Sequence, residues 1–303
     1  MREPGCGRFA PSPTADLHVG NLRTALLAAA AARSSGRDFL WRWEDLDPIA
    51  CRPQFYESQL ADVQALGVEI DSEPVRQSQR RSRHEQVLEE LRAREMLYPC
   101  FCSRRDIAEA VTAPHGDAID GAYPGTCAQL STAQRAQRLE SGRSPAWRVR
   151  ARGERVGVFD ASAGWVERVV DDFVVCRADG VPAYNLASVI DDADFGVTQV
   201  VRGDDLLTTT PRHVYVQRVL GLATPEYVHV PLVVGPDGQR LAKRHGAVTR
   251  WQLRERGWTD GELCRWLIGS CGSAARDFAE FARSFRWADV PAGVVVWSTS
   301  ARP

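Results

Sequence analysis

The sequence RFAPSPTADLHVGN, residues 8–21, decides the expected fold. It combines the end of a short apolar strand, a loop stiffened by proline, and a His-x-Gly directly before an alanine-rich helical run. The first N–H groups of a helix have no partner within the helix, so this pattern predicts a site for the phosphates of a nucleotide. Gly20 would let a ligand approach closely, and His18 can donate a hydrogen bond to a phosphoryl oxygen.

The helix after this stretch is predicted from apolar spacing and from residues suited to its two ends. Asn21 can cap its start, and Gly36 stands where a left-handed residue would end it. Its apolar positions recur at helical spacing and are Leu22, Ala25, Leu26 and Ala29. We expect this helix to lie against a sheet.

A second loop, residues 235–246, reads GPDGQRLAKRHG and follows an apolar strand expected over residues 227–234. Of the 38 lysine and arginine residues in the chain, Lys243 is the only lysine. A lysine ammonium on a flexible stem can follow phosphates as they move, whereas a planar guanidinium prefers a fixed geometry. Lys243 is therefore a candidate for a phosphate-binding group.

Two further strands are expected to end in polar groups. The strand at residues 39–44 places Arg42 and Glu44 on the face opposite its aromatic residues, which indicates a polar ligand, with a surface ion pair as the alternative. Arg202 stands near the end of the apolar run at residues 200–205. Ligands bind at the carboxyl ends of parallel strands, so both ends are candidate site positions.

Three cysteines have spacing that suits a metal. Cys100 and Cys102 are separated by one residue, and Cys127 follows 25 positions after Cys102. Three thiolates at this spacing can surround a soft or borderline cation such as zinc, and a fourth ligand is then needed. Ordinary free thiols are the alternative.

The composition limits the classes of protein. The chain has 303 residues, a formal net charge of -1 and eight cysteines. No apolar run of roughly twenty residues and no signal-peptide pattern is found, so we expect a cytoplasmic protein, without a membrane partner, whose cysteines are thiols or metal ligands. We expect a monomer.

The two stretches at residues 8–21 and 235–246 together resemble the signatures of class I aminoacyl-tRNA synthetases of the glutamyl type. Asn21 replaces the second histidine of the first signature, and Ala242 replaces the usual serine of the second, which removes one hydroxyl. The resemblance implies an α/β fold with a Rossmann-like parallel sheet, an inserted zinc-binding acceptor-type subdomain and a short helical C-terminal region. The expected segments are 1–97 and 171–249 for the two halves of the catalytic domain, 98–170 for the insertion, and 250–303 for the C-terminal region.

The resemblance also implies ligands for individual residues. His18, Gly20 and Lys243 would serve catalysis, and ATP, accompanied by Mg²⁺, would contact His18, Gly20, Asn21 and Lys243. Glutamate would contact Arg8, Phe9, Ala10, Pro11, Ser12, Glu44, Tyr184 and Arg202, with Glu44 meeting its amino group and with Arg8, Tyr184 and Arg202 holding its carboxylates. One structural zinc per chain would be bound by Cys100, Cys102, Tyr123 and Cys127, with His115 as the competing fourth ligand.

The short C-terminal region bears on the RNA acceptor. The long helical anticodon-binding domain of glutamyl-tRNA synthetases has no counterpart after Gly246. The chain therefore most resembles the glutamyl-queuosine tRNA(Asp) synthetases, which implies activation of L-glutamate with ATP and its transfer to queuosine in the anticodon of tRNA(Asp). The alternatives are a truncated glutamyl-tRNA synthetase that charges a tRNA 3′ end, a nucleotidyltransferase acting on another acid, and an inactive tRNA-binding module.

We predict that Lys243→Ala nearly abolishes glutamate-dependent ATP–pyrophosphate exchange and leaves the fold unchanged. Loss of one preorganised charge-stabilising donor costs about a hundredfold or more in rate. Exchange kinetics and circular dichroism of the variant measure the two effects. Near-normal exchange would show that the second signature has been misread.

Overall fold

The main sheet contains seven strands. The computed structural model describes residues 5–103, 105–107, 123–241 and 248–298. The strands of this sheet are β1 Cys6–Phe9, β2 Asp38–Trp43, β3 Val75–Arg76, β6 Arg155–Asp160, β7 Gly164–Val169, β9 Val197–Gly203 and β10 Glu226–Val230. Their order is β3-β2-β1-β9-β10-β6-β7, and only β6 and β7 pair antiparallel. The expected parallel α/β sheet is therefore confirmed, with a hairpin at one edge.

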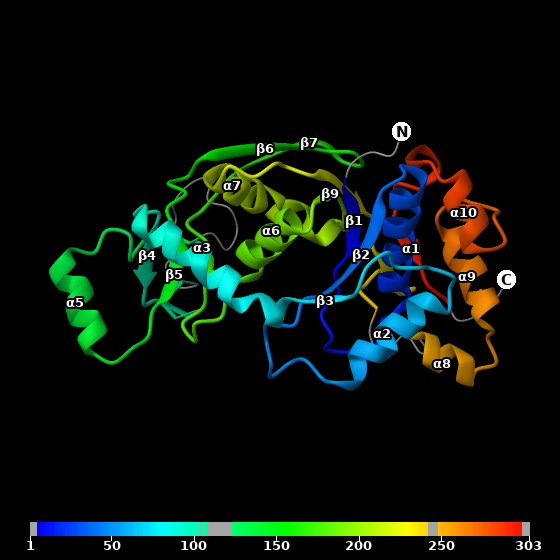
Figure 1. Cartoon of the computed structure of the whole chain (residues 1–303), viewed down its shortest axis with the longest axis horizontal. Coiled ribbons are helices and arrows are strands. Elements are labelled where there is room, and N and C mark those ends of the chain that lie inside the picture. Colours follow the sequence, from blue (N-terminus) through cyan, green and yellow to red (C-terminus); the bar gives the residue numbers. More distant parts are fainter. Residues whose placement is uncertain (1–4, 104, 108–122, 242–247, 299–303) are drawn as a thin grey trace.

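Helices cover both faces of this sheet. The α-helices of the described residues are α1 Val19–Ser34, α2 Gln54–Gln64, α3 Arg81–Ala93, α5 Thr132–Glu140, α6 Tyr184–Asp194, α7 Thr210–Leu220, α8 Arg250–Glu255, α9 Asp260–Ser270 and α10 Phe278–Ser284. Short 3₁₀ turns occur at η1 Gln77–Arg80, η2 Asp204–Thr209 and η4 Trp287–Asp289. Figure 1 shows α1, α9 and α10 on one side of β1, β2 and β9, and α3, α6 and α7 on the other. This is the layer arrangement expected for a parallel sheet, because crossover helices cover both faces.

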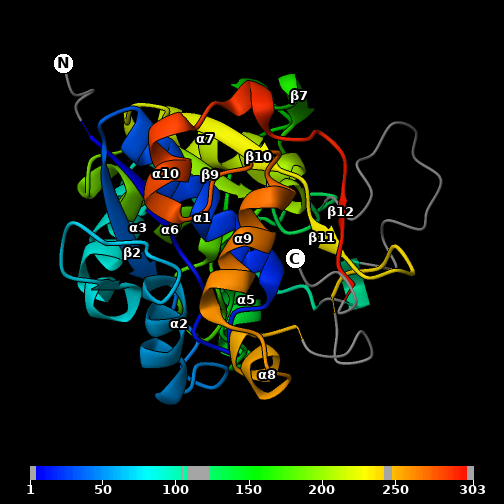
Figure 2. The same cartoon turned by 90° about the vertical axis from the view of Figure 1, so that its right-hand side faces the viewer.

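Helix α1 is the central helix of the larger core. Its predicted apolar positions Leu22, Ala25, Leu26 and Ala29 are fully buried. Small alanine side chains let the sheet and the C-terminal helices approach α1 closely, and Figure 2 shows α9 and α10 beside it. Gly36 has a φ of 73° just after the helix. The predicted glycine at the C-terminal end of this helix is therefore confirmed.

The two faces of β2 enter different parts of the core. Phe39, Trp41 and Trp43 join the cluster around α1, as the alternation predicted. Arg42 points to the opposite face and is fully buried. The charged face of this strand is thus turned inward to the cavity side of the molecule, where a buried guanidinium needs charged or polar partners.

The expected strand at residues 227–234 is interrupted. It divides into β10 and a short β11, Val233–Val234, on either side of Pro231. Proline has no N–H to donate to a neighbouring strand, so the ladder ends there. Strand β11 pairs instead with β12, Val295–Val296, which brings the end of the described chain beside the second signature loop.

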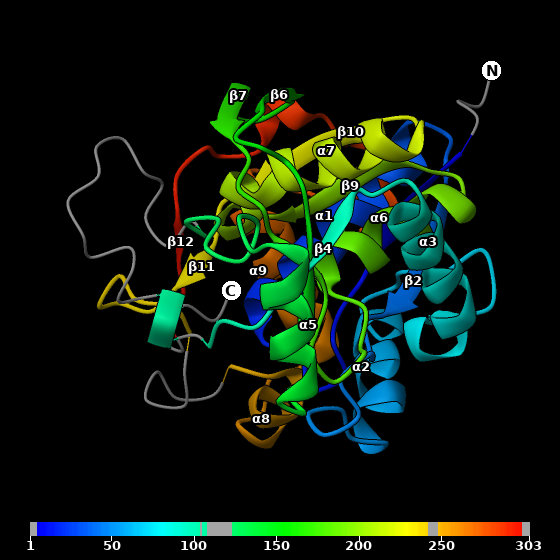
Figure 3. The same ribbon diagram turned by 90° about the vertical axis from the view of Figure 1, so that its left-hand side faces the viewer.

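A small antiparallel sheet extends from the main body. It consists of β4 Leu97–Cys100, β5 Ala146–Val149 and β8 Val174–Cys176, in that order. Figure 3 shows α5 in front of this region, on the side away from the C-terminal helices. Along the chain, β4 and β5 belong to the small sheet, the hairpin β6–β7 belongs to the main sheet, and β8 belongs to the small sheet again. The chain therefore passes from one sheet to the other and back. The division into four segments stays a prediction.

Membrane insertion of a helix is not indicated. Among the described residues, none of the helices is both long enough and apolar enough to span a bilayer.

Candidate active site

Eleven of the residues predicted to contact glutamate or ATP line one cavity of about 710 Å³. They are Arg8, Phe9, Ala10, Pro11, Ser12, His18, Gly20, Asn21, Glu44, Tyr184 and Arg202. The cavity lies at the carboxyl ends of β1, β2 and β9. Strand β1 is flanked by β2, the next strand in the chain, and by β9, which comes much later in the chain. Such a switch point is where open parallel sheets bind ligands. The twelfth predicted residue, Lys243, lies outside the described residues, as do Ala242 and His115.

The loop after β1 is held by hydrogen bonds from neighbouring elements. The backbone N–H of Glu44 donates to the carbonyl of Pro11 at 2.9 Å, which joins the loop to the end of β2. The buried amide of Gln59, on α2, donates to the carbonyls of Ser12 and Ala15 at 3.0 and 2.7 Å. Buried carbonyls need such partners, so the proline-containing loop keeps one conformation at the cavity.

The predicted cap of α1 is wrong, because His18 and not Asn21 is the N-cap residue. The His18 Nδ1 atom accepts hydrogen bonds from the N–H groups of Gly20 and Asn21, at 3.1 and 3.2 Å. The Asn21 side chain in turn accepts from the backbone N–H of His18 at 3.3 Å, which completes a capping box. Gly20 is needed here because a Cβ at this position would lie 2.9 Å from the His18 ring.

The start of α1 differs from the expected phosphate site in one further respect. The N–H of Val19 donates to the carbonyl of Val248 at 2.8 Å, and the next two N–H groups are used by the cap. The backbone donors that the sequence pattern offered to phosphate are therefore already paired. His18 Nδ1 accepts, so the neutral ring carries its proton on Nε2 and can donate from there. Burial and the Arg240 guanidinium lower the pKa of His18, which favours this neutral form.

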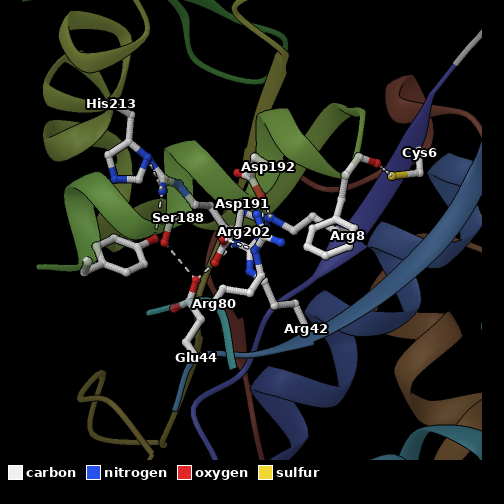
Figure 4. Close-up of polar contacts among 12 residues, drawn as sticks. Cys6, Arg8, Arg42, Glu44, Arg80, Ser188, Asp191, Asp192, Arg202 and His213 are labelled. Carbon is white, nitrogen blue, oxygen red and sulfur yellow. Dashed lines mark hydrogen bonds and ion pairs between the residues drawn. The ribbon is translucent and has the colours of Figure 1, made fainter. Parts of the chain in front are cut away.

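A carboxylate under the cavity is shared by two buried arginines. Asp192 Oδ1 lies 2.5 Å from the Arg42 guanidinium and 3.4 Å from Arg8 Nε, as Figure 4 shows. Arg42 also contacts Glu44 at 3.4 Å, and Ser188 donates to the same Glu44 oxygen at 2.9 Å. Burial raises the pKa of Glu44, and the two arginines and Ser188 oppose that shift. The Arg42–Glu44 pair exists, but it is buried and not the surface pair of the alternative reading.

Arg202 is held by neutral groups only. Its guanidinium donates to His229 Nε2 at 3.0 Å and to the Tyr184 hydroxyl at 2.9 Å. It further donates to Thr210 Oγ1 at 2.8 Å and lies 3.4 Å from His213 Nδ1. Among the described residues no ion pair joins Arg202 to a carboxylate, although only 5% of the residue is exposed. A buried guanidinium at a cavity wall without a carboxylate partner fits a carboxylate ligand.

Several cavity residues were not found from the sequence. They are Thr24, Val201, Gly203, Asp205, Leu206, Leu232, Val233, Arg240 and Leu241. The guanidinium of Arg240 forms an ion pair with Asp205 beside the cavity. Both charges belong to stretches that the sequence already marked, the strand end at 200–205 and the loop at 235–246. Exposed loop charges are common, so neither residue stood out individually.

The described residues on either side of the segment 242–247 lie near the cavity and near the start of α1. Leu241 lines the cavity directly before the undescribed residues 242–247. Val248, directly after them, accepts the hydrogen bond from Val19 at the start of α1. The two signatures are therefore adjacent in space. That His18 and Lys243 meet the same triphosphate stays a prediction.

The three predicted cysteines form one cluster. The Sγ atoms of Cys100, Cys102 and Cys127 lie within 4.8 Å of one another. The Tyr123 hydroxyl lies 3.4 Å from Cys100 Sγ and 3.7 Å from Cys102 Sγ, and it accepts the N–H of Cys127 at 2.8 Å. Tetrahedral zinc with Zn–S distances of 2.3 Å separates its sulfurs by about 3.8 Å. The three sulfurs are therefore close enough together to hold one metal ion, and the Tyr123 hydroxyl lies beside them.

Comparison with known proteins agrees with this geometry. Residues 6–283 match the family model of class I tRNA synthetases (E and Q), catalytic domain. The chain is 51% identical over 287 residues to a Nocardia farcinica protein named Glutamyl-Q tRNA(Asp) synthetase, covering 95% of this chain and 91% of that protein. It is 37% identical to a Glutamate--tRNA ligase 2 from Alkalilimnicola ehrlichii, covering 92% of this chain and 62% of that protein.

The fold agrees with solved structures as well. A glutamate-tRNA synthetase from Elizabethkingia anophelis superposes with a TM-score of 0.85 at 24% identity, over 98% of this chain and 69% of that one. At this identity the likeness concerns the fold. The family model spans nearly the whole described chain, both signatures and the cavity between them. The chain therefore belongs to the class I tRNA synthetases of the E and Q type.

Proposed function

We propose that this protein activates L-glutamate with ATP, forming glutamyl-adenylate, and transfers the glutamate to queuosine in the anticodon of tRNA(Asp). The observation that carries the amino-acid part is Arg202, a buried guanidinium at the cavity wall whose partners among the described residues are all neutral. Such a group favours an acidic side chain over its amide, because the amide would leave the charge uncompensated. Arg8 and Tyr184 line the same cavity and would contact the glutamate with it.

The chemistry needs charge stabilisation more than a protein nucleophile. The α-carboxylate of glutamate attacks the α-phosphorus of ATP and pyrophosphate leaves, so the reactants must be held in line while negative charge spreads over the phosphoryl oxygens. The His18 Nε2–H would donate to these oxygens from one side, and Lys243 from the other. Mg²⁺ enters with the triphosphate and neutralises part of its charge. A hydroxyl of the RNA then attacks the adenylate and releases AMP.

The RNA acceptor is inferred from the relatives. The Nocardia farcinica protein and one from Symbiobacterium thermophilum, 45% identical over 264 residues, both carry the name Glutamyl-Q tRNA(Asp) synthetase. The chain is 51% and 45% identical to these two proteins and 37% identical to the Alkalilimnicola ehrlichii ligase. The higher identity favours queuosine in tRNA(Asp) as the acceptor, and a tRNA 3′ end is the alternative.

The cysteine cluster supports a structural zinc. We propose that Cys100, Cys102, Cys127 and Tyr123 bind one zinc per chain and fix the segment 98–170 as an insertion beside the catalytic domain. Zinc there would join the end of β4 to the segment after Tyr123, and it would supply folding energy and no reaction step.

The two roles of His18 can be separated by a pair of variants. His18→Asn keeps a side-chain oxygen that can cap α1 but removes the Nε2–H donor. We expect ATP–pyrophosphate exchange to fall about a hundredfold or more, with a melting temperature near that of the unchanged protein.

His18→Ala is the matched control, because it removes the cap as well. It should show the same loss of exchange and also lose about 1 kcal/mol of stability, measured by denaturant unfolding. Normal exchange in His18→Asn would mean that the imidazole only caps the helix.

Metal analysis of the purified protein is expected to find about one zinc per chain, because three thiols and a phenol lie close together. Cys100→Ser or Cys127→Ser should lose the zinc and destabilise the small sheet region. Cys176→Ser, at a buried cysteine outside the cluster, should keep it. A stable protein without bound metal would remove the proposed site.

The acceptor is tested by charging assays with labelled glutamate. We expect label on tRNA(Asp) that contains queuosine, and background label on tRNA(Asp) without queuosine and on tRNA(Glu). Charging of tRNA(Glu) would favour the 3′-end alternative.

A further inference from the structure

Behind Arg202 lies a buried pair that the proposed reaction does not use directly. Asp160 ends β6, His229 lies on β10 and Arg202 lies on β9, so the three residues come from adjacent strands. Asp160 and His229 are 1% and 2% exposed. The distances are 2.6 Å from Asp160 Oδ2 to His229 Nδ1 and 3.0 Å from His229 Nε2 to Arg202 Nε. Carboxylate, imidazole and guanidinium thus form a continuous buried chain that ends at the cavity.

The hydrogen bonds determine which nitrogen of His229 carries the proton. A guanidinium only donates, so His229 Nε2 must accept from Arg202. The remaining proton of the neutral ring is then on Nδ1 and is donated to Asp160. Burial and the Arg202 guanidinium lower the pKa of His229, against the opposing effect of the bond to Asp160. The neutral ring with its proton on Nδ1 is therefore the form that this arrangement requires.

Asp160 is itself fixed in place. Its Oδ1 accepts the N–H groups of Ser162 and Ala163 at 3.0 and 2.8 Å, in the turn between β6 and β7. Its Oδ2 also accepts the backbone N–H of His229 at 3.1 Å. Burial alone would raise the pKa of Asp160, but the bonds from His229 and from these N–H groups lower it. The carboxylate is thus ionised and cannot rotate away from His229.

The imidazole also separates two opposite charges. A carboxylate in direct contact with Arg202 would neutralise it, and a neutralised guanidinium could not distinguish an acid from its amide. His229 lies between the two charges. Asp160 therefore fixes the proton of His229 on Nδ1 without neutralising Arg202, whose positive charge can still pair with a ligand in the cavity. The second imidazole near Arg202, His213, is neutral too, because burial and Arg202 lower its pKa well below the ordinary value.

We propose that Asp160 and His229 are positioning residues that fix the guanidinium of Arg202 and thereby set the preference for glutamate over glutamine. The inference rests on the proposed function and adds these residues to it. Asp160 acts only through His229, by holding the proton on Nδ1. His229 acts by presenting a proton-free Nε2 to Arg202. Neither residue touches the substrate.

Asp160→Asn is the first test. The amide can fill the same space but no longer favours a proton on Nδ1, and in a serine protease the same change in a buried Asp–His pair traps the wrong tautomer. We expect the KM for glutamate in ATP–pyrophosphate exchange to rise roughly 10- to 100-fold, the value of a hydrogen bond to a charged group. The ratio of glutamate to glutamine activation should fall, and the KM for ATP should stay within about twofold.

The double variant tests whether Asp160 acts through His229. His229→Gln replaces the ring by a side chain that has no tautomers, and alone it should also raise the KM for glutamate. In this background Asp160→Asn should change the KM for glutamate little more, because there is no imidazole left to orient. If the rise of the glutamate KM in the double variant equals the product of the two single rises, Asp160 acts independently of His229.

His84→Gln is the matched control. His84 and Asp191 form another buried imidazole–carboxylate pair, at 2.8 Å, and neither residue lines the cavity. His84→Gln should lower the melting temperature and leave the KM for glutamate and the ratio of glutamate to glutamine activation unchanged. The KM and this ratio do not depend on the fraction of folded enzyme, so they stay measurable in destabilised variants.

Two further results would contradict the proposal. One is an unchanged glutamate KM and an unchanged glutamate-to-glutamine ratio in Asp160→Asn. The other is an equal rise of the KM values for glutamate and ATP, which would indicate a general structural role. Failure of the proposed function is distinguishable, because the unchanged protein would then show no glutamate-dependent exchange at all.

Discussion

A positive charge buried in a protein needs compensation, and this constraint shapes the wall of the cavity. The Arg42 guanidinium contacts the carboxylates of Asp192 and Glu44, so its charge is balanced within the protein, whereas Arg8 lies 3.4 Å from the Asp192 oxygen that Arg42 already contacts. Arg202 has only neutral hydrogen-bond partners among the residues described here, which leaves its charge for a ligand. A structural guanidinium, that of Arg42, therefore lies beneath the cavity, while Arg8 and Arg202 line it and suit recognition of an acid. Their difference lies in their partners, since the residue type is the same.

The start of α1 shows how one side chain can serve fold and site together. His18 Nδ1 closes the first turn of the helix, and this bond fixes the ring with Nε2 as its remaining donor. Gly20 is required because the ring lies over it. The N–H of Val19 is paired with Val248, which follows the second signature loop. The stability of the helix start and the placement of the two signatures therefore depend on the same few hydrogen bonds.

The topology explains how distant stretches form one site. Strand β1 lies between β2 and β9, and the loops after all three open toward the same edge of the sheet. The hairpin β6–β7 extends the sheet beyond β10 and supplies Asp160 from a segment that the sequence pattern placed in the insertion. The small sheet of β4, β5 and β8 carries the cysteine cluster away from this edge. Reaction site and proposed zinc site are thus separate parts of the structure.

Local periodicity and short motifs in the sequence indicated the helix after residue 18 and the cysteine cluster, and the resemblance to a known family implied the parallel α/β class and most of the candidate cavity residues. It could not determine which residue caps α1, since His18 and Asn21 are both polar and three positions apart. It also could not show that Arg42 pairs with Asp192 or that Asp160 meets His229, 69 positions later. Such contacts form only when strands distant in the chain become neighbours in the sheet. Tertiary structure alone decides which buried charges are neutralised and which one remains for a ligand.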